Sequence, residues 1–203
     1  PTPFSGCEPM DDPFAADFTW HYPDADNCDY SNIQLSNGTF TLRPGTYCGG
    51  IELKPQANVT LQSGIYVIRN GILKVQAGST LTGNGVSVFF RGSGTTIDIR
   101  GGANVSLKAP ASGSYAGFLF VDRTFSWETS TIDATVQGGG NIKLEGILYA
   151  PRWRVLISGN SQINQDSKFF AMIADSFYLE GNGQLFINSD NDAAGLPDLM
   201  PKI

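Results

Sequence analysis

Hydrophobic and polar residues alternate in short runs along most of the chain, and helical periodicity is almost absent. Alternation with a period of two puts successive side chains on opposite faces of a β-strand. Two longer apolar runs, 115–121 and 169–173, suit buried strands. The clearest alternating runs are Val59-Thr60-Leu61, Val105-Ser106-Leu107, Ile142-Lys143-Leu144 and Leu185-Phe186-Ile187. The pattern therefore predicts a protein built almost entirely of short strands.

Turns made of small residues precede these strands at nearly regular intervals. They begin at Ala57, Gly78, Gly102, Gly139, Gly159 and Gly181, at intervals of 21, 24, 37, 20 and 22 residues. A period of about 20 to 24 with several strands per repeat is typical of a β-solenoid, whose coils bury side chains against the neighbouring coils. We expect an all-β fold, a right-handed parallel β-helix over residues 39–190. A sandwich or jelly roll is the alternative, although such a fold would not keep turns of similar composition at regular intervals along the chain.

Two segments at the ends of the repeat have a different composition. Residues 1–38 are aromatic and broken by proline, with a short helix expected from Asp12, and we assign them to an N-terminal segment that caps or wraps the first coil. Residues 191–203 are expected to form an extended C-terminal tail. The 37-residue interval between the turns at Gly102 and Gly139, which includes the segment 114–138, predicts a longer coil, a projecting loop or an extra strand pair. Long loops in compact domains are usually functional.

Composition narrows the class of protein. Of 203 residues, 24 are glycine and only 16% are charged, while 41% are hydrophobic. The hydrophobic fraction is too high for a disordered chain and is sufficient to form a hydrophobic core. A net charge of −6 argues against nucleic acid as a partner. No apolar run approaches the roughly 20 residues of a membrane helix, so we expect no membrane span within this chain. Because the chain starts with Pro1 and shows no signal peptide, we expect a processed or truncated product.

Three cysteines are present, at positions 7, 28 and 48. Cys28 and Cys48 flank a segment with a Pro-Gly turn, and we expect a disulfide between them that stabilises the fold by about 3 kcal/mol. Two unpaired buried thiols are the alternative. Cys7 is then the odd cysteine, with a partner expected upstream of Pro1. With His21 as the single histidine, the chain has too few ligands for a zinc site.

An ordered set of motifs resembles a known family. It consists of Gly6-Cys7 to Ala15, Cys28 to Asn32, Thr41 to Leu53, Lys108 to Phe120, Gly146 to Pro151, Ser158 to Ser161 and Ile173 to Asp175. Together these look like the C-terminal β-helical region of TadG-like proteins of the TadE/TadG family, which serve Flp/Tad pilus assembly in bacteria. The resemblance implies a cell-envelope or surface protein linked to adhesive pili. The family's membrane helix and von Willebrand-type region have no counterpart here, and it supplies no catalytic residues.

Tryptophan next to arginine marks one candidate contact site. In Arg152-Trp153-Arg154, an exposed indole beside guanidinium groups could stack on a sugar ring or anchor a partner, and Trp127 in the long interval could join it. In the alternative, both tryptophans pack against the wall of the solenoid.

Acidic residues give a second set of candidates. Outward-facing carboxylates are expected at Glu52, Asp98, Glu145 and Asp175, and a carbohydrate-acting site would need them clustered. The alternative is that they lie on solvated strand faces. Asp190 and Asp192 are weak candidates for calcium, because the spacing of a known loop is missing. We therefore expect no cofactor, with calcium as a minor candidate.

The leading hypothesis is a non-enzymatic β-helix module, extracytoplasmic and associated with Flp/Tad-type pilus assembly or adhesion. Its expected partners are pilus or cell-envelope proteins and surface glycans. A polysaccharide-binding or polysaccharide-degrading β-helix enzyme is the alternative. An ice-binding β-solenoid ranks third, because the Thr39–Thr41 and Thr80–Thr82 patterns are not expected to recur coil after coil. Uncapped ends that stack into filaments remain a further alternative.

Overall fold

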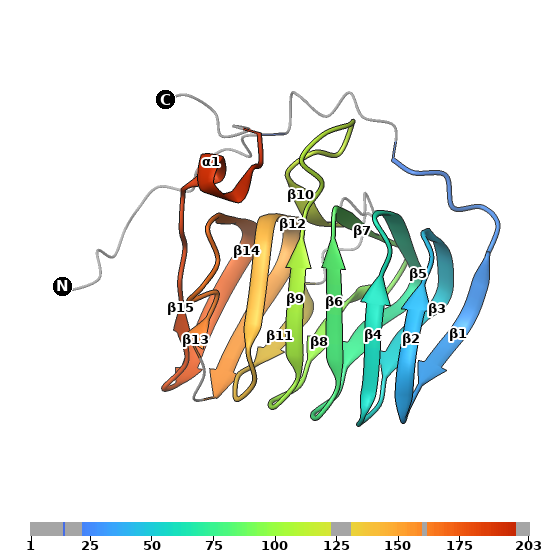
Figure 1. Ribbon diagram of the computed structural model, residues 1–203, viewed down its shortest axis with the longest axis horizontal. Helices are drawn as coiled ribbons and strands as arrows, with labels where there is room; N and C mark the ends of the chain where they lie inside the picture. Colours follow the sequence, from blue (N-terminus) through green and yellow to red (C-terminus); the bar gives the residue numbers. More distant parts are fainter. Residues whose placement is uncertain (1–13, 15–21, 123–130, 160–161, 198–203) are drawn as a thin grey trace.

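The chain winds into a right-handed β-solenoid of about six turns, as the sequence predicts (Figure 1). The computed structural model describes Phe14 and residues 22–122, 131–159 and 162–197. Neighbouring coils pair through parallel strands in register. None of the helices in these described ranges is long and apolar enough to cross a membrane.

Fifteen strands and one short helix make up the described structure, and several strands are long enough to bend around a corner. The first strands are β1 (Tyr30–Leu35), β2 (Gly38–Leu42), β3 (Gly45–Leu53), β4 (Ala57–Leu61), β5 (Gly64–Val75), β6 (Thr80–Asn84), β7 (Val86–Arg91) and β8 (Thr96–Ile99). The others are β9 (Asn104–Lys108), β10 (Phe118–Asp122), β11 (Ile132–Gln137), β12 (Ile142–Gly159), β13 (Gln162–Ile163), β14 (Phe170–Gly181) and β15 (Gln184–Leu185), followed by helix α1 (Asn191–Ala194).

Three faces surround the core. The first face holds β7, β10 and the amino-terminal parts of β3, β5 and β14, together with residues 146–150 of β12. The second face holds β8, β11 and the carboxyl-terminal parts of β3, β5, β12 and β14. The third face holds β2, β4, β6, β9, the start of β12, β13 and β15, and lies across the front of Figure 1.

Inward side chains stack in columns from coil to coil. On the second face, one column runs through Leu53, Val75, Ile99, Val136 and Ile157, all buried. On the third face, a matching column runs through Val59, Leu81, Val105, Ile142 and Ile163. Each apolar side chain is removed from water only by the coils on either side, which is why the repeat needs several coils to be stable.

A repeated tyrosine closes the corner before the first face. The hydroxyl of Tyr47 donates to the carbonyl of Arg43 at 2.6 Å, and that of Tyr66 donates to the carbonyl of Gln62 at 2.8 Å, four residues back in both cases. The two rings stack inside the solenoid with centroids 5.9 Å apart. Burial raises the pKa of both phenols, so they stay neutral donors at physiological pH. The segments 41–47 and 60–66 share the pattern Thr-Leu-x-x-Gly-x-Tyr, and each of them forms this same corner.

The described part of the N-terminal segment covers the side of the stack, over coils beyond the first. Phe14 packs edge-on against Phe118 and Tyr149, with centroids 5.4 and 5.9 Å away, and Tyr22 packs against Phe89 at 5.1 Å. This explains why every residue of β10 is buried although alternate side chains point outward. The stack itself begins at Tyr30, before the predicted boundary at 38, because β1 already pairs with β3. Asn37, with a positive φ of 49°, turns the chain from β1 into β2. The helix expected from Asp12 lies outside the described residues.

The C-terminal end differs from the extended tail that the sequence predicts. Asn191–Ala194 form one helical turn because the side chain of Asp190 accepts a hydrogen bond from the Ala193 amide at 2.8 Å and Gly195 ends the turn with a φ of 62°. Ala194 and Leu196 are buried there. The long interval contributes regular strands, β10 and β11, and its described extra length lies in the loop 109–117.

Candidate functional surfaces

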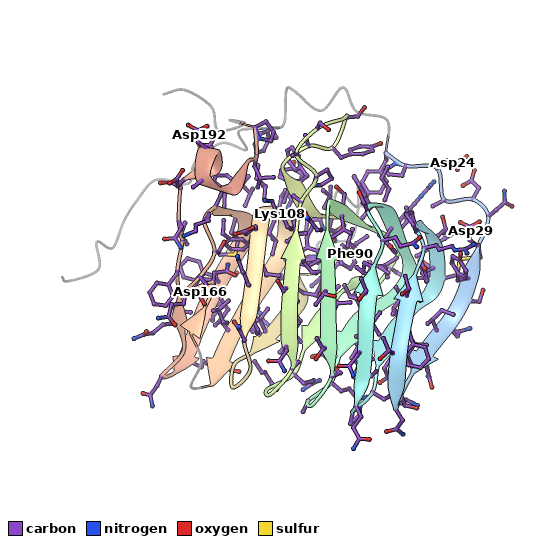
Figure 2. All side chains as sticks on the ribbon, in the orientation of Figure 1. Asp24, Asp29, Phe90, Lys108, Asp166 and Asp192 are labelled. Carbon is purple, nitrogen blue, oxygen red and sulfur yellow. A yellow bond between two sulfur atoms is a disulfide. The ribbon has the colours of Figure 1, made fainter. Side chains whose placement is uncertain are left out.

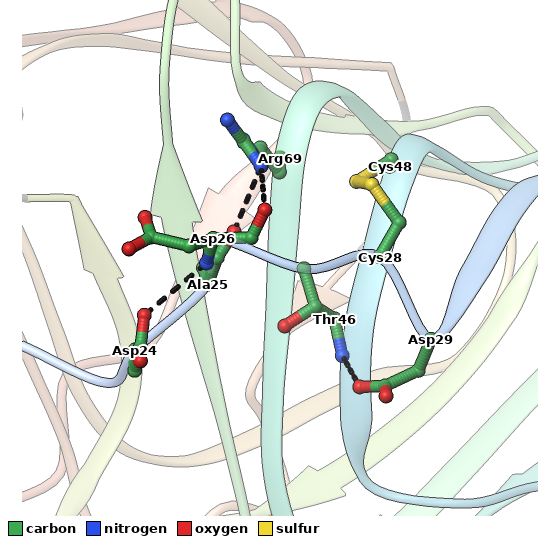
Figure 3. The surroundings of a disulfide bond; sticks show 8 residues. All are labelled: Asp24, Ala25, Asp26, Cys28, Asp29, Thr46, Cys48 and Arg69. Carbon is green, nitrogen blue, oxygen red and sulfur yellow. Dashed lines mark hydrogen bonds between the residues drawn. A yellow bond between two sulfur atoms is a disulfide. The ribbon is translucent and has the colours of Figure 1, made fainter.

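The disulfide between Cys28 and Cys48 is present, with Cα atoms 5.7 Å apart (Figure 3). It joins the N-terminal segment to β3 at the point where that segment enters the stack. Next to it, the Thr46 amide donates to the carboxylate of Asp29 at 2.8 Å. Nη1 of Arg69 donates to the carbonyls of Ala25 and Asp26 at 3.0 and 2.8 Å. The N-terminal segment is therefore held by one covalent bond and several polar contacts.

Opposite charges alternate along the second face. Glu52, Lys74 and Asp98 occupy one outward column, in register on successive coils. Nζ of Lys74 lies 3.1 Å from Oε1 of Glu52, and Nε of Arg100 lies 2.7 Å from Oδ1 of Asp98. The hydrogen bond from Lys74 holds the pKa of Glu52 below its usual range, and a second one from Gln76 adds to this. The two carboxylates do stack in one column, but a lysine separates them, so they form an ion ladder.

Further along the second face, Arg154 is fixed by Asp133. Their side chains form a bidentate pair, with Nε and Nη2 donating to the two carboxylate oxygens at 2.7 and 2.8 Å. This pairing lowers the pKa of Asp133 and raises that of Arg154. The guanidinium carbon also lies 6.0 Å from the ring centre of Tyr178. Arg154 is thus an ordered, half-exposed cation beside an exposed tyrosine.

Trp153 does not belong to this exposed cluster, and its prediction as a surface contact is wrong. The side chain is 0% exposed, and its Nε1–H donates to Oδ2 of the buried Asp122 at 2.6 Å. The ring packs edge-on against Phe90, with centroids 4.9 Å apart, and Figure 2 shows Phe90 inside the stack. The indole fills the corner between the first and second faces because one end is apolar and the other finds a buried acceptor.

The remaining candidates are scattered. Arg152 is half-buried at the same corner, and Trp127 lies outside the described residues, as does Cys7. Asp190 caps α1, while Asp192 lies exposed in its first turn at one end of the stack (Figure 2). Within the described ranges, no three acidic, histidine or cysteine side chains form a group that could hold a metal ion. Asp190 and Asp192 therefore belong to no such group in the described part of the chain.

Glu145 and Asp175 differ in environment. Glu145 is buried and lies between Lys143 and Lys108, with nitrogen–oxygen distances of 3.1 and 3.9 Å, and it accepts a hydrogen bond from the Lys168 amide. Asp175 is exposed and accepts a hydrogen bond from Ser176. The two lysines compensate the buried charge, so Glu145 has a structural explanation.

The third face carries a grid of short neutral side chains, which we call the hydroxyl–amide face. One outward column holds Thr41, Thr60, Thr82 and Ser106, and the other holds Thr39, Asn58, Thr80 and Asn104. The Thr-x-Thr pattern of 39–41 and 80–82 does not recur in every coil, as expected, because Asn58 and Asn104 take the first position in two of them, but a hydroxyl or amide group fills each place of the grid. A shallow pocket of about 310 Å³ lies over the last coils of the grid, lined by Thr80, Thr82, Asn104, Val105, Ser106 and Asn141. The grid ends at Lys143.

Comparison with known proteins identifies the family. A sequence profile described as a domain of unknown function, DUF7305, matches residues 22–193. The chain belongs to the DUF7305 family. Neither a search of curated proteins nor a search of solved structures found a match. The DUF7305 match covers the strands of the solenoid and the wrapping segment from Tyr22 onward, so the family unit includes both.

The hydroxyl–amide face is the feature of this DUF7305 chain that sequence reasoning missed. The strand residues are obvious, but the coils differ in length, so that Thr41, Thr60, Thr82 and Ser106 follow one another at 19, 22 and 24 residues. A search for a constant period separates them. Alignment on the inward neighbours Leu42 and Leu61, which also pair in register, would have found part of the column.

Proposed function

We propose that this chain is a non-catalytic display and binding module of the bacterial cell envelope or surface, and that it works with Flp/Tad-type adhesive pili. The observation that supports the proposal most is the continuous stack of paired coils. A backbone ladder of this kind is a stiff element that presents its outward faces at fixed spacing. The disulfide adds support, because such bonds persist in oxidising compartments. The link to pili rests on the resemblance to TadG-like proteins.

The test uses the bacterium that encodes the chain. Its coding sequence is deleted and then restored with an epitope-tagged full-length copy. We expect the tag to be reached by protease on intact cells, and attachment and pilus display to fall on deletion and return on complementation. Unchanged attachment and pili, or a tag found only in the cytoplasm, would contradict the proposal.

The non-catalytic part is tested separately with purified protein and a panel of uronate polysaccharides. We expect no new chain ends above the level of a Glu52→Gln/Asp98→Asn control, in which the two outward-facing carboxylates of the ion ladder are neutral. If the unaltered protein cleaves a polysaccharide and the control does not, the non-catalytic proposal is wrong. The alternative, a polysaccharide-degrading enzyme, is then supported.

The hydroxyl–amide face favours a second candidate, an ice-binding surface. Coils lie roughly 4.8 Å apart and alternate residues on a strand roughly 6.6 Å apart, so the face repeats in two dimensions. Thr60 and Thr82 are linked through their hydroxyls at 3.2 Å, which orders the grid. Short hydroxyl and amide groups without charge can hold water in that repeating pattern.

This candidate predicts slowed ice recrystallisation by the purified protein. Thr60→Lys/Thr82→Lys places two charges in the grid and should abolish the effect, whereas Thr135→Lys on the second face should leave it unchanged. Because all three threonines point outward, the variants should fold alike, which circular dichroism checks. Absence of any effect in the unaltered protein rejects the candidate.

A further inference from the structure

The last coil of the solenoid leaves core positions uncovered. Phe177 and Leu179 pair in register with Val155 and Ile157, which are buried, so they continue two inward columns. Yet Phe177 is 55% and Leu179 49% exposed. Ile187, which follows β15, is 64% exposed. Apolar groups gathered at one end of a monomer mark an interaction surface, because isolated exposed residues are normal but contiguous patches are not.

The backbone at this end is also open. Among the described strands, β14 pairs with β12 and β15 pairs with β13. Apart from the hydrogen bond from the Phe170 amide to the Asn188 carbonyl at the start of β14, no other described strand pairs with their outer sides. Helix α1 packs near the first face, and Ala194 and Leu196 are buried there, whereas no described element covers the second and third faces of the last coil (Figure 1). Unpaired strand edges with apolar neighbours are templates for further pairing. An occupant must therefore supply parallel strands and apolar side chains together.

The first coil of the same chain has this form. Its inward residues Ile33, Leu35, Phe40 and Leu42 lie half-buried against the core, and β1 and β2 pair only with β3 and β4. We propose that the C-terminal coil of one copy receives the N-terminal coil of a second copy, head to tail, so that the solenoid continues across the contact. Such a contact is heterologous and leaves one free end on each side, so copies add to a filament.

Register supports this occupant. Continuing the columns of the second and third faces across the contact sets Phe177 against Ile33, Tyr178 against Gln34, Leu179 against Leu35, Glu180 against Ser36 and Leu185 against Phe40. The apolar residues oppose apolar residues, and no pair opposes two like charges. The net charge of −6 still repels between copies, so association should strengthen as salt rises.

The first experiment is sedimentation velocity of the full chain over a concentration series at low and high salt. We expect the average sedimentation coefficient to rise continuously with concentration, and more steeply at high salt. Leu179→Lys should abolish the rise because it places a charge in the contact. The matched control is Ile72→Lys, since Ile72 is 39% exposed on the side of the stack. A protein that stays monomeric throughout, or an Ile72→Lys variant that loses association as Leu179→Lys does, overturns the proposal.

The second experiment tests the polarity. Leu35→Lys blocks the N-terminal end, so Leu35→Lys and Leu179→Lys should each be monomeric alone but form a 1:1 dimer when mixed, because each keeps one intact end. If Leu35→Lys unfolds, Gln34→Pro is used in its place. The carbonyl of Leu35 accepts a hydrogen bond from the Lys54 amide, so the amide of the preceding residue, Gln34, points away from β3 to the open edge. Proline removes this donor from the edge. The head-to-tail contact is excluded if Leu35→Lys or Gln34→Pro associates as strongly as the unaltered protein. It is also excluded if the mixture forms no dimer.

Discussion

Single residues decide where each coil can turn. At the corner between the first and second faces, the side chain of Asn32 lies over Gly49 on the next coil, and that of Asn70 lies over Gly92. All four have a positive φ, between 49° and 103°. Asparagine and glycine tolerate this conformation better than other residues. Asparagine and glycine alternate from coil to coil in this column. The side-chain amide of each asparagine occupies the space that the Cβ of a larger residue would fill on the next coil.

Two glycines with a similar φ allow the steric cost of adding a Cβ to be separated from the cost of the left-handed backbone conformation. Gly49 has a φ of 76° and a Cβ there would collide with Oδ1 of Asn32, whereas Gly78 has a φ of 72° and open space around it. Gly78→Ala should lower the free energy of unfolding by about 1–2 kcal/mol, from the left-handed conformation alone. Gly49→Ala should cost more, because Asn32 must also move. Chemical denaturation measures both, and equal losses would contradict this assignment.

Glu52 provides a prediction about pH. Its pKa in the folded state lies below the ordinary value of 4.5, mainly through the hydrogen bond from Lys74. The resulting stability is complete above the ordinary pKa and disappears as the pH falls through the lower folded value. Glu52→Gln should therefore cost ~1 kcal/mol or less at pH 7, because the pair is partly exposed, and nothing at about pH 2. Thermal unfolding across this range tests the sign. Lys74→Met should give the same curve, and a loss that grows with acid would refute the assignment.

At the scale of elements, the N-terminal segment acts as a strap on the first face. The hydroxyl of Tyr22 donates to carbonyls on two adjacent strands, Phe90 in β7 at 2.6 Å and Val121 in β10 at 3.1 Å. The disulfide fixes the same segment further along, at Cys28. Residues 22–29, which form no strand, are thus held by side-chain contacts and by a covalent bond.

Removal of the disulfide should loosen this strap. Cys28→Ser/Cys48→Ser is expected to lower the free energy of unfolding by about 3 kcal/mol, because the open chain gains loop entropy. Limited proteolysis should then cut between residues 22 and 28 before the solenoid is attacked. Dithiothreitol should reproduce both effects in the unaltered protein and add nothing in the double variant. An unchanged unfolding midpoint would show that the polar contacts hold the segment alone.

The elements also explain which predictions succeed. Alternating residues and glycine turns predict the solenoid because they act within a single coil, and the Cys28–Cys48 pairing was found from the turn between the two cysteines. Trp153 was placed wrongly because its partner Asp122 lies 31 residues away, across the long interval. The hydroxyl–amide face was missed because turn lengths vary between coils, and register depends on those lengths. Local patterns therefore fix strands, while surfaces emerge only when coils are set in register.

For the whole molecule, a stack of coils predicts stability that is graded along its axis. Each coil contacts only its neighbours, so central coils open only when the ends have opened. In hydrogen exchange at a concentration where the protein is monomeric, the amides of β7 and β10 should exchange most slowly and those of β14 and β15 fastest. Leu107 is buried in the middle of the third face, whereas Leu185 occupies the last coil and is half-buried.

Two leucine truncations test this gradient. Leu107→Ala should lower the free energy of opening of the slowest amides by the full destabilisation of about 2–5 kcal/mol. The reason is that the coil with the cavity always unfolds when these central amides open. Leu185→Ala should accelerate exchange in β14 and β15 alone, since the central coils retain both neighbours. If Leu185→Ala instead lowers protection equally in β7, the solenoid unfolds as one cooperative unit, and an uncovered last coil would weaken the entire stack.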